Sequence, residues 1–189
     1  MSDTIRAFIA IEFPEEVFAK IREIQKGLKS SGLKLKWVAP ENIHLTLKFL
    51  GDIDSRDLEK IKEAIRETIR GCSRISLVAK GLGVFPGLNR PRVVWVGVSG
   101  ELEQLKRLQQ GLDDSLETLG FPKEERAFCG HLTLARVKGA IHSEKLVEAL
   151  KRFKDIESDP FWVESVVLFK SELTPAGAIY TELMRASLA

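Results

Sequence analysis

Apolar residues follow two alternating spacings along this chain, one typical of strands and one typical of helices. Segment 5–11 is a short run rich in β-branched residues, which predicts a strand. Between Val17 and Leu28 the apolar residues recur every three or four positions, which predicts a helix with one buried face. The same spacing returns in 58–69, and another strand-like run follows at 75–84.

This order of elements is repeated about 87 positions further along the chain. The repeat consists of strand-like runs at 92–98 and 162–169 and of helical spacing over 102–116 and 146–153. We therefore predict one domain, 1–189, with an internal repeat of about 87 residues, roughly 5–87 and 92–174, and a closing strand at 179–185.

The tetrapeptide His-Leu-Thr-Leu occurs twice, beginning at His44 and again at His131, and it sets the offset of 87 positions. Two of the three histidines of the chain begin these copies. In a strand, residues i and i+2 share a face. His44 and Thr46 therefore point to one side, His131 and Thr133 do the same, and the leucines point to the core.

Short joins rich in Pro and Gly, at 85–89 and 174–177, favour antiparallel pairing of the strands that they connect. We predict an α+β protein with a duplicated, two-lobed fold, in which each lobe is a mainly antiparallel sheet backed by two helices. The two motif strands are expected to face each other across a central cleft near a pseudo-two-fold axis.

Composition narrows the class of protein without naming a function. The chain has 189 residues, of which 44% are hydrophobic and 30% charged, and its net charge is +2. No apolar run approaches the roughly 20 residues that a membrane span needs. Two cysteines give no disulfide framework, so we expect a reduced, cytoplasmic setting. Only two Asn and four Gln occur among many charged residues, which leans toward a thermophilic source.

A pair of imidazoles suits a reaction in which one group accepts a proton while another delivers one. The threonine hydroxyls beside them add donors, and together these groups form a cradle suited to phosphate. One His-x-Thr on a strand is usually structural, but core packing does not require such a polar face twice. Neither histidine has further ligands at a recognisable spacing, so we expect no metal and no cofactor.

Two residues near the second motif are weaker candidates for chemistry. Cys129 is two positions before His131, about 6–7 Å along a strand, which is too far for a good nucleophilic pair, so we expect a packed, inert thiol. His142 stands at the start of a predicted helix, where a solvated side chain is expected.

Taken together, the motifs resemble those of the two-histidine phosphoesterase superfamily, in particular the LigT-like RNA 2′,3′-cyclic phosphodiesterases, historically called 2′-5′ RNA ligases. The resemblance covers nearly the whole chain. It rests on the stretches Arg6-Ala-Phe-Ile-Ala-Ile, Asn42-Ile-His-Leu-Thr-Leu-Lys-Phe-Leu-Gly51, Arg92-Val-Val-Trp-Val-Gly97 and His131-Leu-Thr-Leu-Ala-Arg136. One departure is Gly130, where members of the family often have Pro.

The resemblance implies metal-independent hydrolysis of a 2′,3′-cyclic phosphate at an RNA 3′ end to a 2′-phosphomonoester. It implies that His44 is the proton donor to the leaving 3′ oxygen and that His131 is the proton acceptor that activates water. Thr46 and Thr133 would hold the non-bridging oxygens. The near-symmetry of the two motifs does not by itself decide which histidine gives the proton.

Further substrate-binding candidates surround the motifs. In a regular strand Lys48 points to the same side as His44. It is therefore either a lysine that can reach a phosphate or a solvated lysine at a strand end. In a regular strand Arg136 points to the same side as the buried leucines of its motif, which favours a structural role unless the strand bends. Arg90 and Arg92 flank a Pro-containing loop and are candidates for the RNA backbone. Three aromatic residues are candidates for base stacking or for core packing, with the core favoured: Phe85, Trp37 and Phe128.

Two other functions compete with hydrolysis. The same site run in reverse would ligate RNA through a 2′-5′ linkage, and a non-catalytic module would bind RNA ends or nucleotides with the cradle alone. The expected partner is an RNA with a 2′,3′-cyclic phosphate terminus, and tRNA fragments and small cyclic nucleotides are both candidate substrates. The protein is expected to be a monomer that does not bind membranes.

Overall fold

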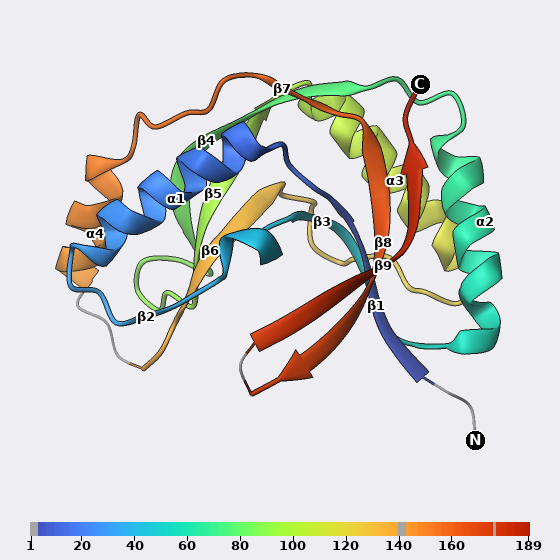
Figure 1. Cartoon of the computed structure of the whole chain (residues 1–189), viewed down its shortest axis with the longest axis horizontal. Coiled ribbons are helices and arrows are strands. Elements are labelled where there is room, and N and C mark those ends of the chain that lie inside the picture. Colours follow the sequence, from blue (N-terminus) through green and yellow to red (C-terminus); the bar gives the residue numbers. More distant parts are fainter. Residues whose placement is uncertain (1–3, 140–142, 176) are drawn as a thin grey trace.

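The computed structural model describes residues 4–139, 143–175 and 177–189, and it confirms the α+β prediction (Figure 1). The helices are α1 (Glu15–Lys29), α2 (Leu58–Ile69), α3 (Leu102–Glu117) and α4 (Ser143–Arg152), with short 3-10 turns at Pro40–Asn42 and Ser55–Asp57. The strands are β1 (Thr4–Ile11), β2 (Leu35–Trp37), β3 (Leu45–Asp54), β4 (Ile75–Phe85), β5 (Val93–Gly100), β6 (His131–Val137), β7 (Phe161–Val163), β8 (Ser165–Thr174) and β9 (Gly177–Ser187).

The strands form one nine-stranded antiparallel sheet in the order β7-β4-β5-β6-β3-β1-β8-β9, with β2 paired to β6. Its middle is nearly symmetric, because β6 and β3 meet at the centre through the pair Leu45–Leu132. These two leucines are 87 positions apart, so the pseudo-two-fold axis passes between equivalent residues. The two lobes of the fold are therefore halves of one sheet.

The lobes do not coincide with the halves of the sequence. Strand β4 belongs to the first half of the chain but pairs with β5 of the second, whereas β8 of the second half pairs with β1 of the first. Each half thus contributes its last long strand to the other lobe. This exchange joins the halves through backbone hydrogen bonds as well as through packed side chains.

The helices cover the sheet in two pairs, α1 with α4 at one end of the molecule and α2 with α3 at the other (Figure 1). A glycine permits close packing in each pair. A Cβ on Gly27 of α1 would lie 2.1 Å from the Phe153 ring, and one on Gly111 of α3 would lie 3.0 Å from Thr68 of α2. These glycines are 84 positions apart, so the repeat shifts register between its helices and its motifs.

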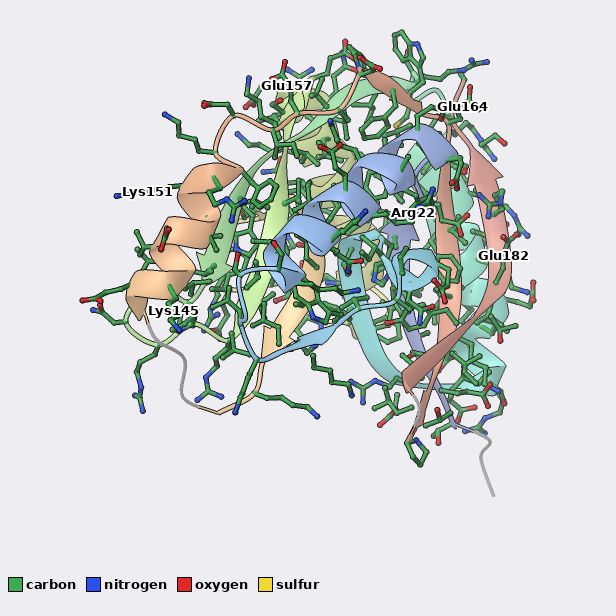
Figure 2. All side chains as sticks on the ribbon, turned by 60° about the vertical axis from the view of Figure 1, so that its left-hand side comes forward. Arg22, Lys145, Lys151, Glu157, Glu164 and Glu182 are labelled. Carbon is green, nitrogen blue, oxygen red and sulfur yellow. The ribbon has the colours of Figure 1, made fainter. Side chains whose placement is uncertain are left out.

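The predicted buried faces are present in the structure. Helix α1 buries Val17, Ile21, Ile24 and Leu28, and α2 buries Ile61, Ile65 and Ile69. Charged side chains such as Lys151 and Glu182 lie exposed at the surface (Figure 2). No helix of the described ranges is long and apolar enough to cross a membrane.

The two faces of the sheet carry separate apolar clusters. The main core lies between the sheet and the helices and contains Leu45 and Leu132. A smaller cluster on the opposite face consists of Phe8, Ala10, Val167 and Phe169, with Tyr180 packed against it. Strand β1 alternates between the two faces, because Ile9 belongs to the main core while Phe8 and Ala10 belong to the smaller cluster. The term "site face" below means the face of Phe8 and Ala10.

Candidate active site

The structure brings the two motifs together at the centre of the sheet. Leu45 and Leu132 are paired and fully buried, so the residues that flank them in each strand point to the site face. The Cα atoms of His44 and His131 therefore lie within about 13 Å of each other. Thr46 pairs with Ala10, which also lies on the site face. The motif residues thus face the same region of the protein.

Each imidazole is held by a hydrogen bond of the same kind, to the carbonyl oxygen two residues before it. Nδ1 of His44 lies 2.9 Å from the carbonyl oxygen of Asn42, and Nδ1 of His131 lies 2.8 Å from that of Cys129. A carbonyl oxygen only accepts, so Nδ1 carries the proton in each ring. Nε2 is therefore the atom of each ring that gains or loses a proton during a reaction.

Asn42 also fixes the surroundings of His44. Its side-chain amide donates to the carbonyl of Ala178 at 2.8 Å, which ties the turn before β3 to the β8–β9 hairpin. The hairpin carries Tyr180, whose ring lies edge-on to the His44 ring at 5.2 Å. On another side the Phe8 ring stacks on His44 at 4.7 Å. His44 is therefore enclosed by aromatic side chains from two separate strands.

This enclosure has an electrostatic consequence. Burial lowers the pKa of His44 to about 4, because an imidazolium loses hydration among aromatic rings. The hydrogen bond to Asn42 and the charge of Glu12 oppose the shift, and the charge of His131 adds to it. His44 is therefore neutral near pH 7 in the free protein.

His131 lies in a different environment. The Phe85 ring meets it edge-on at 4.9 Å, and the Trp95 ring lies 6.2 Å away. The indole of Trp95 lies flat against Gly83, where a Cβ would come within 2.2 Å of the ring. The two motifs are thus alike in backbone geometry but differ in what surrounds each imidazole.

Lys48 does not point to the same side of β3 as His44 and Thr46, as regular alternation along the strand predicted. Thr46 pairs with Ala10 but Lys48 pairs with Ile9, so a β-bulge at Leu47 turns Lys48 toward the main core. There it is 2% exposed, and its Nζ donates to Asp113 Oδ1 at 2.6 Å and to the Pro122 carbonyl at 2.8 Å. The prediction that Lys48 reaches a phosphate or is solvated is wrong for this geometry.

The same bulge in the second motif corrects the expectation for Arg136. Thr133 pairs with Trp95 and Ala135 with Val94, so Leu134 is the extra residue. Arg136 is consequently on the site face and exposed, rather than on the core face with the leucines. Strict alternation along the strand failed at Lys48 and Arg136 for one physical reason, because a bulge reverses the side on which the residues that follow it point.

Arg136 lies near a second exposed guanidinium. Burial raises the pKa of Tyr180, and the charges of Arg136 and Arg6 oppose that rise. Arg6 shares a face of β1 with Phe8. Arg6 and Tyr180 were not predicted from the sequence as site residues, and only the alternation of β1 pointed to the face of Arg6.

The remaining candidates divide between loop and core. Arg90 and Arg92 are exposed in the join between β4 and β5, where the Arg92 backbone N–H donates to the Phe85 carbonyl at 2.7 Å. Phe128 packs against the main core, as does Trp37. Phe85 instead contacts His131, so core packing describes the first two aromatic residues but not the third.

Two expectations about the flanks of the second motif need comment. The Cys129 side chain is exposed, so the prediction of a packed thiol is wrong. Its carbonyl orients His131 as described above. His142 lies outside the described residues. Within the described ranges, no three His, Cys, Asp or Glu side chains are grouped so that they could hold a metal ion.

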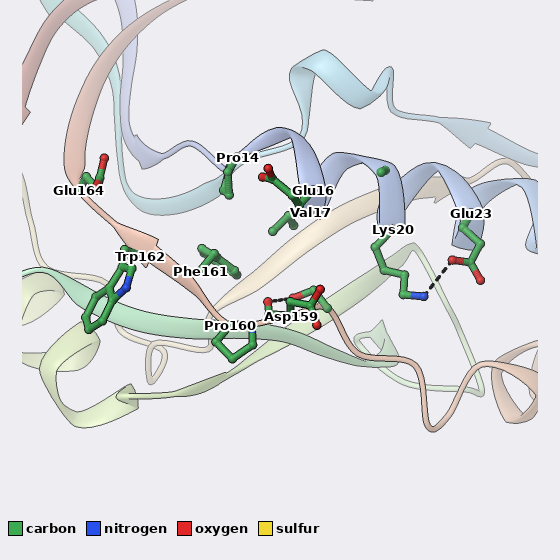
Figure 3. A pocket seen from close by; sticks show the side chains of 12 residues that line it. Pro14, Glu16, Val17, Lys20, Glu23, Asp159, Pro160, Phe161, Trp162 and Glu164 are labelled. Carbon is green, nitrogen blue, oxygen red and sulfur yellow. Dashed lines mark hydrogen bonds and ion pairs between the residues drawn. The ribbon is translucent and has the colours of Figure 1, made fainter.

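A cavity of about 570 Å³ lies elsewhere, between the start of α1 and the segment around β7 (Figure 3). Its walls combine apolar Phe161 and Trp162 with charged groups of both signs, among them Lys20, which is paired with Glu23 at 2.9 Å. Neither motif histidine lines it. The catalytic candidates are therefore those on the site face.

The chain is similar to known proteins along nearly its whole length. A sequence model described as LigT like Phosphoesterase matches the chain twice, over residues 11–95 and 96–180. An RNA 2′,3′-cyclic phosphodiesterase of Methanothermobacter thermautotrophicus is 40% identical over 179 residues, which cover 95% of this chain and 96% of that protein. A protein of the same name from Thermotoga maritima is 38% identical, over 95% of this chain and 93% of that protein.

Solved structures show the same fold. The protein TT0787 of Thermus thermophilus superposes with a TM-score of 0.82 at 30% identity, covering 97% of this chain and 98% of that one. LigT of E. coli, solved in complex with 3′-AMP, has a TM-score of 0.78 at 23% identity and covers 99% of each chain. The double match, the curated relatives and the shared fold lead to one conclusion: the chain belongs to the LigT-like phosphoesterase family.

Proposed function

We propose that this protein hydrolyses 2′,3′-cyclic phosphate ends of RNA to 2′-phosphomonoesters by metal-independent general acid–base catalysis. The observation that carries the proposal is the matched pair of imidazoles, each with Nδ1 held by a carbonyl and Nε2 left for chemistry. The curated relatives support the substrate class, since they are named RNA 2′,3′-cyclic phosphodiesterases.

In the proposed reaction, Nε2 of His131 takes a proton from water while the water oxygen bonds to phosphorus. The bond from phosphorus to the 3′ oxygen breaks, and the Nε2 proton of His44 passes to that oxygen. Thr46 and Thr133 donate to the non-bridging oxygens as their negative charge grows. Each positioned acid or base contributes roughly 10²–10⁴-fold to the rate. The family resemblance supports this assignment of donor and acceptor.

Because burial keeps His44 neutral in the free protein, its role as an acid requires that it gain a proton when the substrate binds. With a pKa of about 4, the free imidazole holds little proton at neutral pH. A bound phosphodiester brings a negative charge beside the ring, and an opposite charge within about 4–6 Å favours the imidazolium. The enclosure by Phe8 and Tyr180 keeps water from screening that attraction. The bound substrate thus raises the pKa of His44 and so favours the protonated ring that can act as an acid.

Binding of the RNA end is proposed to use the exposed guanidiniums on the site face. The charges of Arg136 and Arg6 both act on Tyr180 beside His44, and these guanidiniums suit phosphate oxygens, whereas Lys48 is committed to Asp113. We infer a single-domain, monomeric, cytoplasmic enzyme whose internal duplication spans roughly 5–87 and 92–174, with the closing strand 179–185. Ligation at the same site would use an RNA 5′-hydroxyl in place of water to open the ring, and the abundance of water favours hydrolysis over it.

The test is an RNA oligomer ending in a 2′,3′-cyclic phosphate, incubated with the protein in the presence of EDTA. We expect a 2′-phosphomonoester, and loss of turnover by at least about 10²-fold in His44→Ala and His131→Ala. Thr46→Ala should also lose turnover, because it removes a donor to the phosphate. Its control is Thr118→Ala, which changes an exposed threonine at the end of α3 and should retain activity. A 3′-phosphate product would reverse the donor assignment, and tight binding without turnover would support a binding module.

A further inference from the structure

Lys36 and Arg136 are two exposed cations held side by side on neighbouring strands. They are direct Cα partners in the antiparallel pairing of β2 with β6, so their side chains point to the same side of the sheet. Like charges directly opposite each other destabilise a pair of strands. The stability of the sheet therefore does not account for two cations at this position.

The side on which these cations lie is the site face. The neighbours of Lys36 in β2, Leu35 and Trp37, both pack against the main core, so the lysine between them points away from it. The bulge in β6 turns Arg136 the same way. Both cations are thus on the face of the sheet that carries the motif histidines and threonines.

The pair lies a short step from the motif of β6. The residues of β5 that are opposite Thr133 and Arg136 are two positions apart, which corresponds to about 7 Å along the strand. Successive phosphates of an RNA strand have a comparable separation. When Thr133 holds one phosphate, the next phosphate of the same strand is therefore within reach of Lys36 and Arg136.

Both cations are available to an anion. Among the residues that the structure describes, neither forms an ion pair with a carboxylate. The repeat offers a contrast, because the residue 87 positions after Lys36 is Lys123, which lies outside the strands. Its ammonium is paired with Asp114 at 2.5 Å and with Glu117 at 3.3 Å. The lysine of the first copy is therefore the one left for a ligand.

We propose that Lys36 and Arg136 form a subsite for the phosphodiester on the 5′ side of the terminal nucleotide. This proposal rests on the proposed function and names its substrate class, which is an RNA strand rather than a mononucleotide. An ammonium beside a guanidinium suits the two free oxygens of one phosphodiester, because hydrogen bonds between charged groups are stronger than neutral ones. Binding of that anion also offsets the repulsion between the two cations.

The test compares adenosine 2′,3′-cyclic monophosphate with the dinucleotide ApA that ends in a 2′,3′-cyclic phosphate, since only the dinucleotide has the additional phosphodiester. For Lys36→Ala we expect kcat/KM to fall on the order of 10-fold with the dinucleotide, mainly through KM, and to stay unchanged with the mononucleotide. The slope of log kcat/KM against log salt concentration should flatten by about 0.7 with the dinucleotide, as expected for one lost phosphate contact. Lys36→Arg should retain activity on both substrates. Lys26→Ala removes an exposed lysine from α1, on the helix side of the sheet, and should affect neither substrate.

A neutral methylphosphonate linkage between the two nucleosides is the matched control on the substrate side. With this linkage, the wild-type protein and Lys36→Ala should have the same kcat/KM. Equal losses of Lys36→Ala on the mononucleotide and the charged dinucleotide, or no loss on either, would overturn the subsite while leaving the proposed function intact.

If the wild-type protein hydrolyses neither substrate, the proposed function fails, and the subsite is then tested by binding alone. The probe is ApA with a 2′-phosphate at its end, titrated calorimetrically into the wild-type protein and into Lys36→Ala. Weaker binding by Lys36→Ala supports the subsite, whereas equal binding, or no binding by either protein, refutes it.

Discussion

Replacing Lys48 with Met separates a structural lysine from a catalytic one. Met keeps the length of the apolar stem but removes the ammonium, which donates to Asp113 and to the Pro122 carbonyl. The side chains of Lys48 and Asp113 are 1% and 11% exposed, so the carboxylate would be left buried and partly unpaired, with Gln109 as its remaining donor at 2.8 Å.

Breaking one side of such a buried pair costs about 3–5 kcal/mol. For a chain of 189 residues, 1 kcal/mol lowers Tm by about 2–4 °C, so Lys48→Met should lower Tm by roughly 6–20 °C. Calorimetry and urea unfolding measure this change. Because Lys48 points away from the motif histidines, kcat with a cyclic-phosphate substrate should stay within about twofold of wild type well below Tm.

The double variant Lys48→Met/Asp113→Leu provides the matched control. Replacing both partners by apolar groups is often neutral or stabilising, so the double variant should recover most of the lost stability. If Lys48→Met unfolded like the wild type but lost activity, the bulge argument and the inward position of Lys48 would be refuted.

Three further predictions concern the motif strands. The pKa of His44 is depressed from 6.5 to about 4 on folding, so the unfolded chain binds the proton more readily, and the free energy of unfolding should fall by up to about 3 kcal/mol as pH drops from 6.5 to 4. Urea titrations at several pH values check this, and His44→Gln should lack that part of the dependence. The profile of kcat/KM against pH should be bell-shaped with its acidic limb near pH 4, and Phe8→Leu should move that limb upward by removing the stacked ring; a rate rising steadily from about pH 5 to 9 would contradict two-histidine catalysis. A Cβ on Gly130 would lie 2.7 Å from Val98 Cγ2, so Gly130→Ala should cost about 1–3 kcal/mol of stability, and adding Val98→Ala should restore it if the clash is the cause.

The sequence determined much of the site because its chemistry is local. Two copies of His-Leu-Thr-Leu, with period-two alternation, were enough to place the imidazoles and hydroxyls on one side and the leucines in the core. The helical spacing of apolar residues likewise predicted which faces of α1 and α2 are buried. Such patterns follow from backbone geometry within a single element, so they can be read without knowing the partners of that element.

Only the tertiary structure decided which strands pair and what surrounds each imidazole. The exchange of β4 and β8 between lobes depends on hydrogen bonds between residues far apart in the chain. The bulge at Leu47 in β3 and the one at Leu134 in β6 are visible only against a partner strand, and they send Lys48 into the core and expose Phe49 and Arg136. The difference between two identical motifs also arises there, because His44 is enclosed by Phe8 and by Tyr180 from the far end of the chain. A tetrapeptide carries the proton-transferring group, but desolvation by distant side chains sets the pKa of that group.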